Sequence, residues 1–294
     1  MRLDTLETFI AGTPPPGHGG RYFIFVRLTT ACGITGIGEI YSASFAPEVV
    51  CRMAEDMFAR YLEGRAPDRI EHFWRQAHGS GFTHRPDTSV QGVVSGLEMA
   101  CWDIVGKALD RPVYALLGGL VNERLRTYTY LYPPEGADPA DFYNDPHASA
   151  EVAAARVAEG FSAVKFDPAG QYTVYDGRMP DLEAIAQSVA FCREIRAAVG
   201  DRADMLFGTH GQFTAAGALR LARQLEPFDP LWFEEPCPPD MPEEMAKVAA
   251  GTSIPVATGE RLCSKFEFAR VLDLGAAAIL QPDLGRAGGI LEGK

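Results

Sequence analysis

The chain has 294 residues, of which 47% are hydrophobic and 22% are charged, and its formal net charge is −12. These values are typical of a globular protein large enough for two domains, and the acidic balance argues against nucleic acid as a partner. No apolar run approaches the roughly 20 residues that a membrane-spanning helix needs, no signal peptide is evident, and the six cysteines form no CxxC pair. We therefore expect a cytoplasmic protein with reduced thiols and no membrane partner.

The first part of the chain predicts a small α+β capping domain over residues 1–122. Its candidate strands are 1–10, 21–30 and 33–40, the last two forming a hairpin. Its two candidate helices are 46–64 and 89–109, in which apolar residues recur at helical spacing.

The remaining residues, 123–294, predict a second domain in which strands and helices alternate. Six candidate strands follow one another, at 127–132, 162–167, 204–210, 231–236, 256–260 and 278–283. Alternating β/α units of this length predict a TIM-type (β/α) barrel, so the expected fold class is α/β. A complete barrel has eight strands, and we therefore expect a barrel whose C-terminal strands are missing. Either the sequence is an incomplete version of a longer protein, or the barrel is open and another subunit covers its edges.

Three of the candidate strands end in an acidic residue, namely Glu234, Glu260 and Asp283, at steps of 26 and 23 residues. Such a step is about one strand, one turn and one helix, so the three ends are expected on one rim of the barrel, where barrel enzymes place their chemistry. Carboxylates that converge there repel one another unless a cation lies between them. Oxygen ligands of this kind favour Mg²⁺, and the pattern therefore predicts a metal-dependent enzyme.

Two basic residues on the same rim are candidates for proton transfer. Lys165 lies two residues before Asp167 in the second barrel strand, so both side chains are expected on one face. A lysine beside a metal loses proton affinity and can act as a base, and a structural Lys165–Asp167 ion pair is the alternative. His210 ends the third candidate strand, which makes it a candidate acid or base.

Motifs along most of the chain resemble the mandelate racemase branch of the enolase superfamily, and most closely its acid-sugar dehydratases of the D-galactonate dehydratase type. The motifs are GLEMACWDIVGKALDRPVYALLGG (96–119), AVKFD (163–167), THGQ (209–212), WFEEP (232–236), ATGERL (257–262) and QPDLGRAGGILE (281–292). Taken together and in this order, they are highly specific.

The resemblance implies a Mg²⁺-dependent enzyme that removes the proton next to a sugar-acid carboxylate and eliminates water through an enediolate. It implies that Glu234 and Glu260 are two of the three metal ligands. It also implies that Lys165 is the first lysine of a pair on the second strand, and that Asp167 stands where the second lysine, often the base, would be. It also implies that His210 protonates the departing hydroxyl group and that Asp283 orients a histidine on a seventh strand. Enzymes of this kind are expected to act on a small sugar acid and to form homo-oligomers.

One position departs from the pattern that the resemblance implies. Gly208 stands where the family has its first metal ligand, an aspartate, and glycine offers no ligand. His210, Asp167 or a water molecule is then the candidate third ligand. Arg21, Tyr41 and Asp167 are candidates for binding the substrate, with the loops 17–21 and 41–45 as the selecting surface and 168–180 as a segment that reaches over the site.

Three rival functions stay open from the sequence. A racemase or cycloisomerase would use the same enediolate. A non-catalytic relative is favoured by Gly208 and by the missing strands. A Schiff-base aldolase that uses Lys165 would leave the converging carboxylates unexplained.

Overall fold

The computed structural model describes residues 1–14, 17, 20–41, 46–80, 87–167 and 178–294, and it divides into two compact units. The first unit comprises Met1–Glu123, Glu260–Glu267 and Pro282–Lys294, and the second comprises Arg124–Gly259 and Phe268–Gln281. Two segments that the sequence assigns to the barrel, 260–267 and 282–294, thus belong to the first unit.

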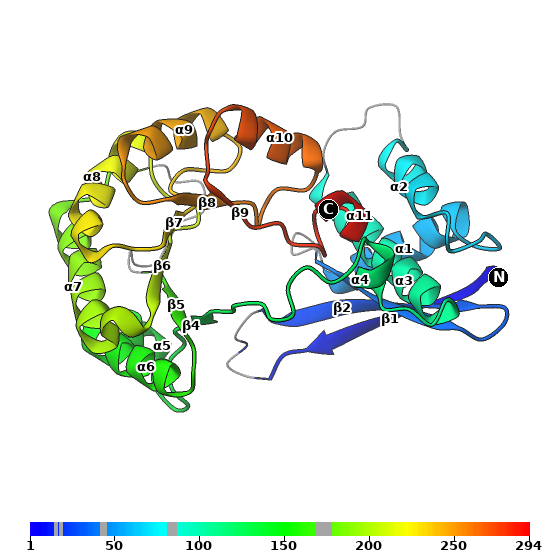
Figure 1. The fold of residues 1–294 in the computed structure, drawn as a ribbon, viewed down its shortest axis with the longest axis horizontal. Coiled ribbons are helices and arrows are strands. Elements are labelled where there is room, and N and C mark those ends of the chain that lie inside the picture. The colour runs from blue at the N-terminus through cyan, green and yellow to red at the C-terminus, as the bar shows by residue number, and fades with distance from the viewer. Residues whose placement is uncertain (15–16, 18–19, 42–45, 81–86, 168–177) are drawn as a thin grey trace. The chain divides into compact units, whose positions relative to one another are not determined.

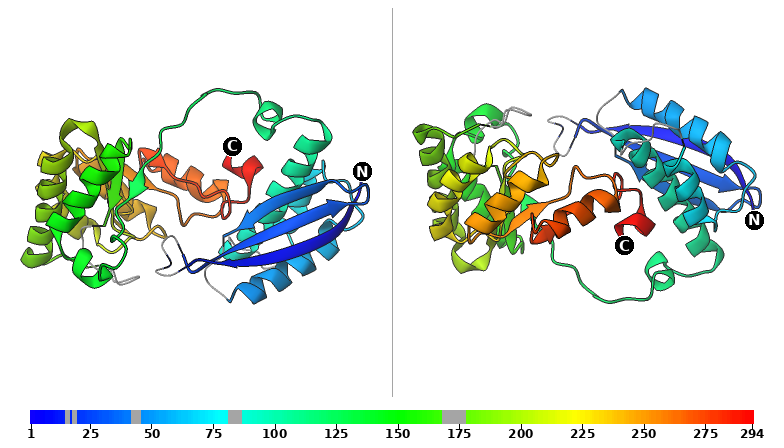
Figure 2. Two further views of the ribbon diagram at one scale, coloured as in Figure 1. Left: turned by 90° about the horizontal axis from the view of Figure 1, so that it is seen from below. Right: turned by 90° about the horizontal axis from the view of Figure 1, so that it is seen from above.

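An antiparallel sheet of three strands, in the order β1–β2–β3, is the base of the first unit. The strands are β1 (Leu3–Gly12), β2 (Tyr22–Thr30) and β3 (Thr35–Ile40). Along β2 every second residue is buried, because Ile24, Val26 and Leu28 face the core. Helices cover this face of the sheet, as the two views of Figure 2 show.

The first unit contains more helices than the two that the sequence patterns predicted. Its helices are α1 (Pro47–Tyr61), α2 (Ile70–His78), α3 (Thr88–Ala108), α4 (Val113–Leu116) and α11 (Ile290–Gly293). Among the helices that were not predicted, α2 is short but amphipathic, with Ile70, Phe73, Trp74 and Ala77 buried.

Two glycines of β3 allow α3 to lie directly on the sheet. A Cβ atom at Gly38 would come within 1.8 Å of the carbonyl oxygen of Gly96, and one at Gly36 within 2.1 Å of that of Ala100. The glycine-rich stretch of the predicted hairpin therefore serves close helix–sheet packing.

The second unit is a parallel sheet of six strands in the order β4–β5–β6–β7–β8–β9. The strands are β4 (Thr129–Tyr130), β5 (Ala163–Phe166), β6 (Asp204–Gly208), β7 (Trp232–Glu234), β8 (Val256–Thr258) and β9 (Ile279–Leu280). The helices are α5 (Pro139–Phe142), α6 (Pro146–Ala158), α7 (Leu182–Val199), α8 (Ala215–Leu225), α9 (Pro242–Gly251) and α10 (Lys265–Asp273), with 3₁₀ turns η1 (Gly200–Arg202) and η2 (Glu226–Phe228). Figure 1 shows α6 to α9 outside the curved row of strands, and the predicted (β/α) architecture with six strands is thus confirmed for the part of the chain that the structure describes.

The register of this sheet separates a packing face from a polar face. Phe166, Phe207 and Phe233 are aligned on neighbouring strands, with ring centroids 6.0 and 5.3 Å apart in edge-to-face contact. Gly208 pairs with Glu234 one residue further along, so position 167 lies level with both on the opposite face.

The predicted strand 204–210 is too long, because β6 ends at Gly208. His210 and Gly211 have φ angles of 51° and 72°, which no strand residue adopts. His210 therefore lies in the turn after the strand. β7 ends in the same way, since Glu235 has a φ angle of 42°.

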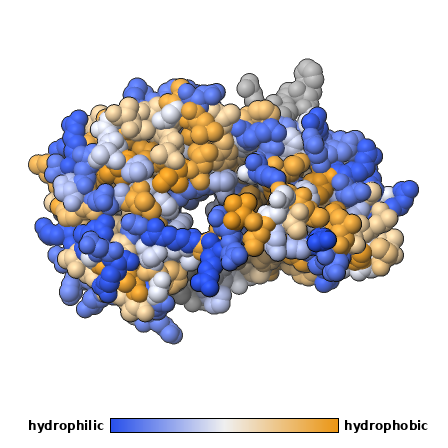
Figure 3. Space-filling view, in the orientation of Figure 1, coloured by the Kyte–Doolittle hydropathy of each residue, from blue (hydrophilic) through white to orange (hydrophobic). Residues whose placement is uncertain are grey.

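On the face drawn in Figure 3, hydrophobic residues gather in several patches between areas of hydrophilic residues. Within the described ranges, none of the helices is both long enough and apolar enough to cross a lipid bilayer.

Candidate active site at the strand ends

A buried ion pair lies at the centre of the polar face of the second unit. The Nζ atom of Lys165, on β5, donates to Oε1 of Glu234, the last residue of β7, at 2.6 Å. Both side chains are buried. The other carboxylate oxygen of Glu234 accepts hydrogen bonds of 3.1 Å from Trp232 and from Gln281. A buried charge pair of this kind is stable only because further hydrogen bonds satisfy its remaining atoms.

The ion pair that the structure gives for Lys165 is with Glu234, and the charge of Lys165 also acts on Asp167, whose pKa it lowers. The ammonium group of Lys165 also lies 5.9 Å from the centre of the Tyr128 ring. Tyr128 in turn packs edge-on against Trp232 at 5.5 Å. The rings of Tyr128 and Trp232 therefore line the site on the side of the Lys165 ammonium group.

Asp167 follows β5 directly and lies beside Lys165 on the polar face. Its Oδ2 atom accepts a hydrogen bond of 2.9 Å from the hydroxyl group of Tyr130 and lies 3.4 Å from Nδ1 of His210. Burial raises the pKa of Asp167, and the charge of His210 and the hydrogen bond from Tyr130 oppose that rise. Burial and the neighbouring Asp167 carboxylate likewise raise the pKa of Tyr130 above its ordinary value, so its hydroxyl stays protonated and donates.

Four of the predicted residues, Lys165, Asp167, His210 and Glu234, are thus brought together in the second unit. The others, Arg21, Tyr41, Glu260 and Asp283, belong to the first unit. Of the predicted loops, 42–45 and 168–177 lie outside the described residues, as do 18–19.

Asp283 organises the turn that follows β9. Its Oδ1 atom accepts a hydrogen bond of 2.7 Å from the backbone of Gly285, and its carbonyl accepts from the backbone of Arg286. The guanidinium group of Arg286 lies 4.3 Å from the centre of the Tyr41 ring. Burial and the charge of Asp283 raise the pKa of Glu39 in the same unit.

The residues of the second unit offer the oxygen donors that Mg²⁺ prefers, but they do not enclose an ion by themselves. Within the described ranges, no three His, Cys, Asp or Glu side chains form a metal-ligand group. The Oδ1 atom of Asp167 is nevertheless a buried carboxylate oxygen without a hydrogen-bond partner among the described residues, and Glu234 adds a second carboxylate on the same face. The donor chemistry therefore fits a hard cation.

Three residues that contact the site, Tyr130, Trp232 and Gln281, were not among the predicted site residues. Trp232 lies two residues before Glu234 in β7, and Gln281 directly follows β9. Because side chains two residues apart in a strand share a face, the spacing from Glu234 was a signal that could have found Trp232.

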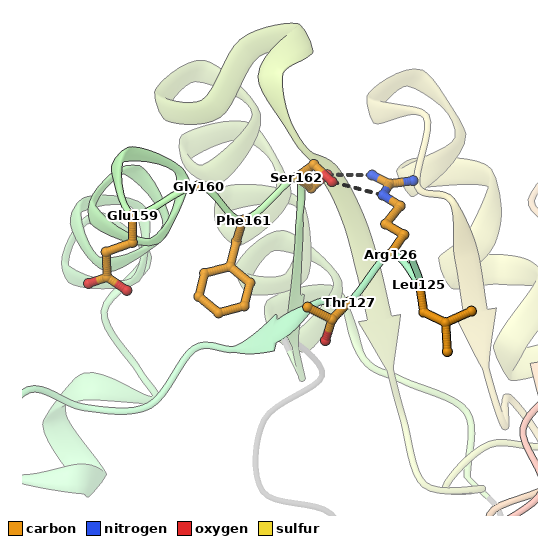
Figure 4. A pocket seen from close by; sticks show the side chains of 7 residues that line it. All are labelled: Leu125, Arg126, Thr127, Glu159, Gly160, Phe161 and Ser162. Carbon is orange, nitrogen blue, oxygen red and sulfur yellow. Dashed lines mark hydrogen bonds between the residues drawn. The ribbon is translucent and has the colours of Figure 1, made fainter. Parts of the chain in front are cut away.

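A separate pocket of about 340 Å³ lies among residues that precede the strands. Figure 4 shows Arg126 reaching Ser162, which it contacts through both the side chain and the backbone; its guanidinium group also pairs with Asp204. Ser162 precedes β5 and Asp204 begins β6, so this pocket is at the amino ends of the strands. Since barrel enzymes use the carboxyl ends, we do not assign the chemistry to it.

Two family models match the chain. Residues 148–294 match the model described as enolase C-terminal domain-like, and residues 18–118 match the mandelate racemase/muconate lactonizing enzyme N-terminal domain. Together they cover most of both units.

Curated relatives of similar sequence are named D-galactonate dehydratases. The relative from Ralstonia nicotianae is 39% identical over 270 residues, which are 92% of this chain and 66% of the relative. The relative from Xanthomonas axonopodis pv. citri is 38% identical over 292 residues, or 99% of this chain and 70% of the relative. The chain thus spans about two thirds of the length of these proteins.

Solved structures described as mandelate racemase/muconate lactonizing enzymes are also similar to this chain. A mandelate racemase/muconate lactonizing enzyme-like protein from Roseovarius sp. TM1035 is 58% identical, with a TM-score of 0.97 over 99% of this chain and 74% of that one. A mandelate racemase/muconate lactonizing enzyme from Sulfitobacter sp. is also 58% identical, with a TM-score of 0.97 over 100% and 74%.

Proposed function

The chain belongs to the mandelate racemase/muconate lactonizing enzyme family of the enolase superfamily, and from this premise we propose that it is a Mg²⁺-dependent sugar-acid dehydratase. Enzymes of this superfamily generally use a divalent metal, and the curated relatives are named dehydratases. In the proposed reaction, a proton leaves the carbon next to the substrate carboxylate, and water is eliminated from the resulting enediolate.

The observation that carries the proposal is the meeting of a lysine, a histidine and two carboxylates on one face at the carboxyl ends of β5, β6 and β7. This is where a barrel keeps its catalytic groups. Lys165 and His210 can exchange protons, while Glu234 and Asp167 balance their charges.

Glu234 and Glu260 are the residues that we propose to hold Mg²⁺. A bound cation supplies positive charge for the oxygen atoms of the substrate carboxylate as negative charge develops on them. The Nζ atom of Lys165 is proposed as the base that takes the proton, and His210 as the acid that returns one to the departing hydroxyl group.

The proposed substrate is a small sugar acid, and D-galactonate is the first compound to test because the relatives carry its name. Arg21 and Tyr41 are proposed to contact it, since both are exposed in the first unit and Arg21 can pair with a carboxylate. We also propose a cytoplasmic homo-oligomer, which sedimentation analysis would test.

Calorimetric titration with Mg²⁺, together with a sugar-acid panel assayed for 2-keto-3-deoxy products, tests this function. We expect Mg²⁺ to bind the wild type, and we expect Glu234→Gln and Glu260→Gln each to abolish that binding and turnover. Glu63→Gln, at an exposed position, is the matched control and should bind normally. Epimerised substrate without a keto acid would instead identify a racemase.

A second candidate is a relative that binds no metal. It is favoured by Gly208 and by the closed Lys165–Glu234 ion pair. Absence of Mg²⁺ binding at millimolar concentrations, unchanged by Glu234→Gln, would support this candidate and refute the dehydratase.

A further inference from the structure

The Asp167 carboxylate connects side chains from three neighbouring strands. Its Oδ2 atom accepts a hydrogen bond of 2.9 Å from the hydroxyl group of Tyr130, on β4. The same Oδ2 atom lies 3.4 Å from Nδ1 of His210, which follows the end of β6. The second distance is that of an ion pair and exceeds a normal hydrogen bond. Catalytic contacts of this length commonly shorten when substrate binds.

The backbone around His210 holds the imidazole toward Asp167. His210 has a φ angle of 51°, a left-handed conformation that is strained for a non-glycine residue. The buried hydroxyl of Thr209 donates to the carbonyls of Glu234 and Glu235, both at 2.8 Å, and the N–H of Gly211 donates to Glu235 at 2.7 Å. These bonds fix the turn to the end of β7, so the strained conformation is maintained.

Gly208 leaves the space that the Asp167 carboxylate occupies. A Cβ atom at position 208 would lie 2.0 Å from Oδ1 of Asp167 and 3.4 Å from Cε of Lys165. No side chain fits there while Asp167 keeps this position. The Asp167 carboxylate can therefore take this position only because residue 208, on the adjacent strand, is a glycine.

We propose that Asp167 is the positioning residue of His210, that Tyr130 holds the Asp167 carboxylate in place, and that Gly208 is required to admit it. Asp167 accepts the Nδ1–H of the imidazole, which leaves Nε2–H to act on the substrate. This inference rests on the proposed dehydration and names how its acid is oriented.

In the step that follows, His210 protonates the leaving hydroxyl group. The Nε2–H of the His210 imidazolium gives its proton to the departing hydroxyl oxygen as the C–O bond breaks and its electron pair goes to that oxygen. The electron pair of the enediolate forms the new carbon–carbon double bond. Water leaves, and His210 becomes neutral.

The test observes His210 directly and then through kinetics. In ¹⁵N-histidine-labelled protein, with the His210 signals assigned from His210→Asn, we expect a proton on Nδ1 in the wild type and a changed tautomer or protonation state in Asp167→Asn. Tyr130→Phe should give a smaller change in the same direction. The exposed positions Asp201→Asn and Tyr114→Phe are matched controls and should leave the spectrum unchanged.

A double-mutant cycle shows whether Asp167 acts through His210. Asp167→Asn should lower kcat by about 100-fold or more with little change in KM, as loss of an orienting carboxylate does. In the His210→Asn background the same substitution should have almost no further effect. Multiplicative losses, or an unchanged His210 spectrum in Asp167→Asn, would overturn the proposal.

Two further outcomes separate this inference from its premise. If Asp167→Asn loses Mg²⁺ binding while His210 is unchanged, then Asp167 is a metal ligand and the positioning role is wrong. If the wild type dehydrates no sugar acid but the His210 spectrum responds to Asp167→Asn and Tyr130→Phe, the positioning holds and the proposed reaction fails.

Discussion

At the scale of single residues, Gly208 shows how the absence of a side chain shapes a polar site. The strand pairing places positions 167, 208 and 234 side by side on one face. A carboxylate from only one of the first two can occupy the space between the strands, because the atoms would otherwise be 2.0 Å apart. In this chain the carboxylate comes from Asp167.

Gly208→Ala is predicted to displace the Asp167 carboxylate and to reduce the free energy of unfolding by about 1–3 kcal/mol, the usual cost of overpacking a filled site. Urea denaturation measures the stability, and the His210 spectrum reports the lost contact. Gly12→Ala is the matched control, since a Cβ there meets nothing within 4 Å. Equal stability of the two variants would show that the Asp167 side chain moves freely.

At the scale of elements, one carboxylate on α3 anchors the short helix α11 in the first unit. Glu98 is fully buried and accepts hydrogen bonds from the backbone N–H groups of Ile290 at 2.8 Å and Leu291 at 2.9 Å. Trp102 donates to the same carboxylate at 2.7 Å. Glu98 thus satisfies N–H groups that the first turn of a helix leaves without partners.

Glu98→Ala is predicted to cost about 2–4 kcal/mol of stability, because it leaves buried donors without an acceptor. We also expect faster amide hydrogen exchange at Ile290 and Leu291. Glu63→Ala, at an exposed position, is the control and should change neither measurement. Unaltered exchange in Glu98→Ala would mean that α11 is held by other contacts.

The same residue predicts a pH dependence. Burial raises the pKa of Glu98 above its ordinary value of 4.5, although the hydrogen bonds it accepts oppose the rise. The folded chain therefore binds the proton at a higher pH than the unfolded chain, and its stability rises as the pH falls through the folded pKa toward 4.5. Urea denaturation at neutral pH and near pH 5 should show a larger loss for Glu98→Ala at the lower pH. A smaller loss of stability for Glu98→Ala at the lower pH would contradict the predicted direction of this pH dependence.

At the scale of the whole molecule, all six cysteines are free, and five are buried. Burial raises the pKa of the Cys237 and Cys263 thiols to about 12 and those of Cys101 and Cys192 further. Cys32 is exposed, and a hydrogen bond with Thr30 lowers its pKa. The thiolate is the reactive form, so the thiols differ strongly in reactivity.

Titration of the native protein with a thiol reagent should therefore modify one cysteine rapidly, and denaturant should release all six. Cys32→Ser should remove the rapid phase, while Cys51→Ser, at a buried position, should leave it. Several rapid equivalents in the native protein would show that the core opens on the time scale of the reaction.

Periodicity along the chain was enough to predict the β/α alternation, the capping sheet and the strand ends that carry Lys165 and Glu234. These features are local, because a strand shows its buried face every second residue and a helix about every 3.6 residues. The motifs likewise indicated the family, which the comparisons confirm. The short helix α2 was not predicted, because an amphipathic pattern over so few residues is a weak signal for a helix.

The partners within the site were decided by tertiary structure alone. Lys165 forms an ion pair with Glu234, which lies 69 residues away in the sequence. Strand register brings Asp167 beside Gly208, and positive φ angles turn His210 back toward it. No spacing in the sequence states which side chain faces which across neighbouring strands, because that depends on register and on the turns after the strands. The sequence by itself therefore determined which residues are available at the strand ends, and the fold determined which of them meet.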